Sequence, residues 1–86
     1  MPHWEPVLTL DRGAPGPIYA RIAAAVAADI RSGRLRPGDA LPGARTLARD
    51  LGVHRNTVVA AYTALQGQGW IESAEARRHR VSGAVP

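Results

Sequence analysis

The sequence has no cysteine, which excludes a disulfide framework and a zinc site built on thiolates. Phenylalanine and lysine are also absent, and the aromatic residues are only Trp4, Tyr19, Tyr62 and Trp70. Leucine, isoleucine, valine and alanine must therefore fill the interior, and we read the aromatic residues Tyr19, Tyr62 and Trp70 as part of that core. A core with so few large side chains is thin, so we expect modest stability.

Long hydrophobic runs are missing as well. The longest apolar stretch, residues 22–28, is far shorter than the roughly 20 residues that a membrane-spanning helix needs. Residues 1–16 combine proline, tryptophan and charges of both signs, which is unlike a secretory signal. These features predict a soluble cytoplasmic protein without a membrane partner.

Arginine supplies all of the basic charge. The 86 residues carry 11 basic and 7 acidic side chains, for a net charge of +4. Arginine suits phosphates and guanine edges, although a GC-rich genome explains the same usage equally well. Position is more informative, because residues 45–80 hold six of the arginines against three acidic residues.

Hydrophobic spacing predicts a first helix after Pro17, where Ile22, Val26 and Ile30 recur every four residues and residues 32–33 end the helix. Residues 36–39 match a type II turn, and residues 40–41 form a very short strand. Proline and glycine break any helix in residues 1–16, which we expect to be an extended arm.

Two further helices and a hairpin complete the predicted order. A second helix begins near residues 43–44 and stops at Gly52; a third starts after His54 and ends before Gly67. The alternating tail predicts strands over residues 70–72 and 80–82. The predicted fold is α+β, mostly α: a winged helix-turn-helix over residues 17–83, with three helices, a short strand and a C-terminal β-hairpin wing.

The third helix, about residues 55–66, has the features of a recognition helix. Arg55 and Asn56 fall at its N-terminal end, the end that reaches base edges in the major groove, where arginine pairs with guanine and asparagine with adenine. Val59 and Ala60 are small enough for close approach to the groove floor or to a thymine methyl group. For Thr57 we favour binding of a phosphate, or hydrogen bonding at the start of the helix, over base recognition.

Other basic residues fit the DNA backbone. Arg45 falls in the first turn of the second helix, and Arg77 and Arg78 fall in the wing, residues 73–80. The N-terminus of a helix also offers free N–H groups to a phosphate. The partner that the sequence predicts is double-stranded DNA.

Residues 17–82 resemble the winged-helix domain of the GntR family, and specifically its MocR subgroup. The matching segments, in chain order, are Pro17-Ile18-Tyr19, Ile30-Arg31-Ser32-Gly33-Arg34-Leu35, Pro37-Gly38, Leu41-Pro42, Arg45, Leu47-Ala48, Asp50-Leu51-Gly52-Val53, Arg55-Asn56-Thr57-Val58-Val59-Ala60-Ala61-Tyr62 and Gly69-Trp70-Ile71-Glu72-Ser73. The resemblance implies that Arg45, Arg55, Asn56 and Thr57 contact DNA.

The sequence departs from the family pattern at His54, where serine usually caps the helix and contacts a phosphate. Histidine is a poorer cap than serine, so the family pattern alone does not establish the phosphate contact here. We keep His54 among the candidate DNA-binding residues. Gly43 replaces a second capping serine, and residues 74–79 replace a glycine-rich wing tip. Regulators of the MocR subgroup also carry a C-terminal domain that dimerises and binds pyridoxal phosphate, and this chain has no residues for that cofactor.

Two alternatives remain open at this point: a winged-helix module for protein–protein contact, and a DNA-binding fragment of a longer, pyridoxal phosphate-dependent regulator. His3, His54 and His79 lack metal-ligand spacing, and Ser32, Ser73 and Ser82 have no general base in register. We therefore expect no metal, no cofactor and no enzymatic activity. The sequence leaves open whether two copies form a homodimer.

Overall fold

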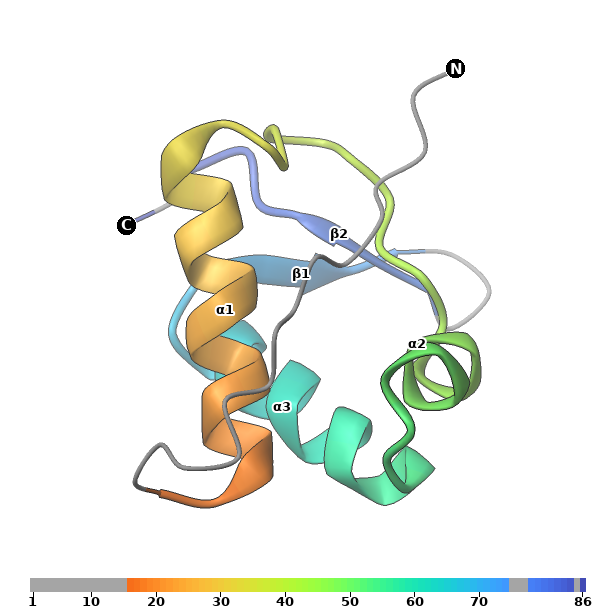
Figure 1. The fold of residues 1–86 in the computed structure, drawn as a ribbon. Helices are drawn as coiled ribbons and strands as arrows, with labels where there is room; N and C mark the ends of the chain where they lie inside the picture. The colour runs from red at the N-terminus through yellow and green to blue at the C-terminus, as the bar shows by residue number, and fades with distance from the viewer. Residues whose placement is uncertain (1–15, 75–77, 85) are drawn as a thin grey trace.

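Within the part of the chain that the structure describes, three helices are followed by two short strands. The computed structural model describes residues 16–74, 78–84 and 86. In chain order, the elements are α1 (Ile18–Ser32), α2 (Ala44–Leu51), α3 (Arg55–Gly67), β1 (Ile71–Ser73) and β2 (His79–Val81). In Figure 1, α1 stands beside the strands, α3 runs across its lower end, and α2 lies at the opposite end of α3. The arm predicted over residues 1–16 lies outside the described residues, except for Gly16.

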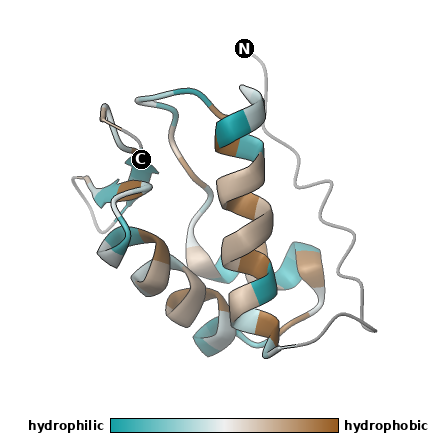
Figure 2. Ribbon diagram, turned by 90° about the vertical axis from the view of Figure 1, so that its left-hand side faces the viewer, coloured by the Kyte–Doolittle hydropathy of each residue, from teal (hydrophilic) through white to brown (hydrophobic). Residues whose placement is uncertain are grey.

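Helix α1 forms on the predicted hydrophobic stripe. Ile22, Val26 and Ile30 are buried at successive turns, and hydrophobic bands recur along the helix in Figure 2. The helix ends at Gly33, whose φ of +86° suits glycine and whose N–H donates to the Ile30 carbonyl oxygen at 3.2 Å. The stripe faces the core shared with α3, because both helices bury their apolar side chains there.

The wing is an antiparallel pair of strands that is tied to the segment before α2. Ile71 pairs with Val81 and Ser73 pairs with His79. The predicted strand at residues 40–41 is a single bridge between Ala40 and Arg80. Before it, residues 36–39 form the expected turn, with a bond from the Asp39 N–H to the Arg36 carbonyl oxygen at 2.9 Å.

Two details of the sequence prediction are wrong. Both strands lie one residue closer to the hairpin tip than predicted. The Trp70 N–H donates to the Leu65 carbonyl oxygen at 3.0 Å at the end of α3, while the Trp70 carbonyl oxygen accepts from the Ser82 N–H at 3.0 Å, so residue 70 links α3 to the strand pair. Tyr19, which we read as a core residue, is 40% exposed. It lies in the first turn of α1, and burial in this helix begins only at Ile22.

The order of elements confirms the predicted fold class, a mostly helical α+β winged helix-turn-helix. The predicted core is confirmed except at Tyr19: Tyr62 is buried, and Trp70 packs against the core while partly exposed. No helix among the described residues has the length and hydrophobicity to cross a membrane.

Candidate nucleic-acid interface

Helix α3 separates an apolar inner face from a polar outer face. Val58, Ala61, Tyr62 and Leu65 are at most 2% exposed and form its inner face. The outer face carries four exposed residues that the sequence assigned to DNA: Arg55, Asn56, Val59 and Ala60. The guanidinium and amide therefore stand on the solvent side of the helix, as predicted.

A tight turn fixes the angle between α2 and α3. Gly52 adopts a φ of +69°, and its N–H donates to carbonyl oxygens of the last turn of α2. The Val53 N–H donates to the Ala48 carbonyl oxygen at 3.0 Å, and the Val53 side chain packs against the core. This turn brings the start of α3 beside α2 (Figure 1).

His54 caps α3 despite being a poor capping residue by type. Its Nδ1 accepts a hydrogen bond from the Asn56 N–H at 3.0 Å, and its carbonyl oxygen accepts from the Thr57 N–H at 3.0 Å. The imidazole thus supplies the side-chain cap of this helix. By contrast, Gly43 gives α2 no side-chain cap.

Tyr62 holds the helix-turn-helix against the wing. Its hydroxyl donates to the Pro42 carbonyl oxygen at 2.7 Å, just before α2, and its ring lies 5.1 Å from the His79 ring in β2. Burial raises the pKa of Tyr62 above its ordinary value, because the phenolate would lose hydration. Pro42 and His79 are positioning residues that the sequence did not reveal, since both lie far from Tyr62 along the chain.

The electrostatics near the two helix starts favour an anion. Neither α2 nor α3 has an acidic side chain in its first turn, so the positive end of each helix dipole is not neutralised there. Arg45 is exposed in the first turn of α2, and Arg49 and Asp50 are exposed near its end. Thr57, half-buried in the first turn of α3, completes the predicted set on this helix.

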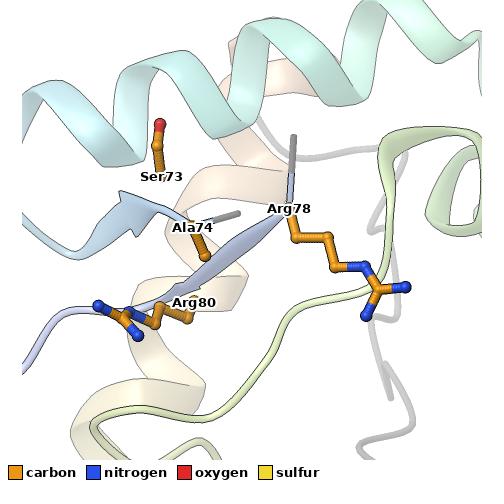
Figure 3. Close-up of a pocket in the computed structure, with 4 residues that line it drawn as sticks. All are labelled: Ser73, Ala74, Arg78 and Arg80. Carbon is orange, nitrogen blue, oxygen red and sulfur yellow. The ribbon is translucent and has the colours of Figure 1, made fainter. Parts of the chain in front are cut away.

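Of the two wing arginines predicted to contact DNA, the structure describes Arg78, whereas Arg77 lies outside the described residues. Arg78 is exposed and, with Ser73, Ala74 and Arg80, lines an open hollow on the wing. In Figure 3, Arg78 and Arg80 extend in opposite directions, with Arg78 reaching towards the segment that leads into α2. Arg80 pairs with Glu72 at 2.8 Å, and Gln66 donates to Ser73 at 3.1 Å, which ties β1 to α3. Of the two wing arginines that the structure describes, Arg78 is thus the one that extends towards the segment before α2.

This arrangement agrees with the comparison to known families. Residues 18–81 match the family described as "Bacterial regulatory proteins, gntR family". The chain belongs to the GntR family. Within it, this GntR domain is 42% identical over 67 residues to the probable rhizopine catabolism regulatory protein MocR of Rhizobium meliloti. That match covers 78% of this chain and 14% of MocR. The regulator Rv1152 of Mycobacterium tuberculosis is 38% identical over 77% of this chain and 54% of its own length.

Solved structures place the GntR domain in the same fold. YtrA from Sulfolobus acidocaldarius, a GntR-family transcription factor, superimposes with a TM-score of 0.86 at 39% identity, over 92% of this chain and 83% of YtrA. The AraR DNA-binding domain in complex with operator ORX1 superimposes with a TM-score of 0.74 at 26% identity, over 79% of this chain and 82% of that domain. The GntR domain itself spans about one seventh of the length of MocR.

Proposed function

We propose that this GntR domain binds double-stranded DNA in a sequence-specific manner, with α3 in the major groove and the wing, residues 73–80, on the flanking backbone. The observation that carries the proposal is the outer face of α3, where Arg55 and Asn56 are exposed at the N-terminal end. In a helix-turn-helix, this end of the second helix reads base edges. The operator complex of the similar AraR domain supports the same use of the fold.

The remaining predicted residues divide between groove and backbone. Val59 and Ala60 would face the groove floor, since both are small and exposed. Arg45, His54 and Thr57 would contact phosphates near the two helix starts. Arg77 and Arg78 would reach the backbone from the wing, where contacts fix orientation and carry no sequence information.

We further propose that the domain is the N-terminal, DNA-binding part of a MocR-like transcriptional regulator. The similarity to MocR over a small fraction of its length supports this arrangement. A second domain would supply dimerisation, so that two GntR domains engage two half-sites, and would bind pyridoxal phosphate. We assign no catalytic role to the domain itself and place its action in the cytoplasm, where a bacterial chromosome is found.

The test begins with selection of a preferred duplex from a randomised pool, followed by fluorescence anisotropy over a range of salt concentrations. Affinity for the selected duplex should fall steeply with salt, because phosphate contacts release counterions. Arg55→Ala should weaken binding and lower the discrimination at one base pair by about 1–3 kcal/mol.

Arg34→Ala is the matched control, since it removes the same charge from an exposed residue. The segment after α1 that contains it lies at the far end of the molecule from the α2–α3 turn (Figure 1). If the affinity for duplex DNA changes neither with salt concentration nor with Arg55→Ala, sequence-specific DNA binding through α3 is excluded. A stoichiometric protein partner covering Arg45 and Arg55 would instead favour a protein–protein module.

A further inference from the structure

The wing is too short to hold its own orientation. β1 and β2 have three residues each, and an isolated two-stranded hairpin is at best marginally stable in water. The direction of the wing relative to α3 therefore depends on contacts with the rest of the domain. β2 has such contacts along one edge, where backbone groups of residues 38–41 bond to His79 and Val81.

Helix α3 holds β1 at both ends. Just before the strand, the Trp70 N–H donates to the Leu65 carbonyl oxygen at 3.0 Å. At the last residue of the strand, the side-chain amide of Gln66 donates to the Ser73 hydroxyl oxygen at 3.1 Å. The bond to Ser73 is therefore the contact that fixes the far end of β1 on the helix.

Two residues of α3 meet one pair of residues in the wing. Tyr62 and Gln66 are four residues apart, so they lie on the same face of α3, one turn apart. Ser73 and His79 are opposite each other in the two strands, so they lie on the same face of the wing. Gln66 bonds to Ser73. The Tyr62 ring lies 5.1 Å from the His79 ring. The last pair of the wing is thus held on α3 at two points.

Arg78 lies directly beyond this pair. Its carbonyl oxygen accepts a hydrogen bond from the Ala74 N–H at 2.7 Å, which continues the wing by one more bond. Its side chain is exposed and extends towards the segment that leads into α2 (Figure 3). The place of this guanidinium relative to α3 therefore follows from where Ser73 and His79 are held.

We propose that Gln66 is a positioning residue for DNA binding. Its bond to Ser73 holds the wing at the angle at which Arg78 meets a backbone phosphate while α3 lies in the major groove. The inference rests on the proposed DNA binding and adds a residue that acts on DNA through another. Because the contact with a phosphate is ionic, a neutral residue that governs it must affect the salt dependence of binding. A glutamine that served only local stability would leave that dependence unchanged.

The first experiment follows the wing without DNA. Hydrogen exchange of the Ala74 N–H reports on opening of the wing, because that N–H is bonded to Arg78. Gln66→Ala should accelerate this exchange about threefold, the scale of one hydrogen bond. Gln68→Ala is the matched control, since it removes an exposed glutamine side chain two residues further along. Equal exchange rates in the two variants would overturn the inference.

The second experiment measures affinity for the selected duplex over a range of salt concentrations. Arg78→Ala should lower the affinity and reduce the salt slope by about 1, as expected for one phosphate contact. Gln66→Ala removes no charge, yet it should lower the affinity about threefold and reduce the salt slope by part of that amount. In the Arg78→Ala background, Gln66→Ala should have little further effect. The base preference should stay unchanged, because the base contacts of α3 are retained.

The partner of Gln66 provides the rescue. Ser73→Ala should reproduce the loss caused by Gln66→Ala, and the two changes together should lower affinity no further than either alone. Ser73→Thr keeps the hydroxyl group, so it should retain the wild-type affinity and salt slope. Thermal unfolding verifies that each variant remains folded. Alanine is favourable at residue 66, an exposed position within a helix.

The outcomes separate this inference from the proposed function. If the wild-type domain selects no duplex, the proposed DNA binding fails and this inference fails with it. If the domain binds DNA but Gln66→Ala weakens binding equally with and without Arg78, the role of Gln66 alone is wrong. A salt slope that Gln66→Ala leaves unchanged leads to the same conclusion.

Discussion

Tyr62 joins three parts of the molecule through one side chain. Its ring is buried in the core and lies tilted against the His79 ring of the wing, and its hydroxyl donates a hydrogen bond to the Pro42 carbonyl oxygen just before α2. Arg45 lies three residues after Pro42, and Arg55 lies on the helix that carries Tyr62. The contact therefore helps to set the spacing between two arginines that we propose to face DNA.

Removal of the hydroxyl tests this role. Tyr62→Phe should lower the free energy of unfolding by about 1 kcal/mol, because the Pro42 carbonyl loses its partner while the ring stays packed. Chemical denaturation measures the change. Tyr19→Phe, at a 40% exposed position, should change it by less than about 0.5 kcal/mol. Equal effects of the two variants would argue against a structural role for the hydroxyl.

At the level of the element, the predictions succeeded where one residue type or one spacing decides the outcome. The stripe of Ile22, Val26 and Ile30 fixed the buried face of α1, and Gly52 marked the end of α2. The same periodicity on α3 placed Arg55 and Asn56 on the outside.

The details that sequence did not reveal depend on contacts between distant segments. β1 begins only at Ile71 because the Trp70 N–H donates to the end of α3, and Tyr19 is exposed because burial on α1 begins one turn later. The capping role of His54 depends on side-chain geometry that its residue type does not reveal. Spacing thus predicted which residues face outward, whereas it could not predict the bonds that hold them there.

The same substitution should have opposite effects at two glycines. Gly52→Ala should destabilise the domain by about 1 kcal/mol, because the φ of +69° is unfavourable for any residue with a Cβ. Gly67→Ala, in the last turn of α3 where φ is not positive, should stabilise it by up to about 1 kcal/mol. A Cβ meets no atom within 4 Å at either position, so backbone conformation alone separates them. Thermal unfolding of both variants checks the signs of the two changes. If both variants are less stable than the wild type, backbone conformation does not separate the two positions.

Across the molecule as a whole, the exposed arginines have different roles. Exposed arginines near the α2–α3 turn and on the wing are assigned to DNA, while Arg80 is paired with Glu72 on the surface. Such exposed pairs contribute little to stability. The fold therefore depends on its apolar core, and the described arginines of the proposed interface are exposed.

At alkaline pH, the free energy of unfolding should depend on pH mainly through Tyr62. The sequence has no lysine and no cysteine, the other side chains whose ordinary pKa values lie near that of tyrosine. Burial raises the pKa of Tyr62 in the folded state above the ordinary value of about 10 that it regains on unfolding. Folding thus favours the neutral phenol. Its contribution to the free energy of unfolding is complete below about pH 10 and is lost as the pH rises further.

We therefore expect the free energy of unfolding of the wild-type domain to be level up to about pH 10 and to fall by about 1.4 kcal/mol per pH unit above it. Denaturation at a series of alkaline pH values measures the slope, and phenolate absorbance follows the two tyrosines directly. Tyr62→Phe should remove the slope. Tyr19→Phe should retain it, since Tyr19 is exposed in the folded domain. A slope that survives Tyr62→Phe would place the alkaline sensitivity elsewhere and contradict the burial of this phenol as its cause.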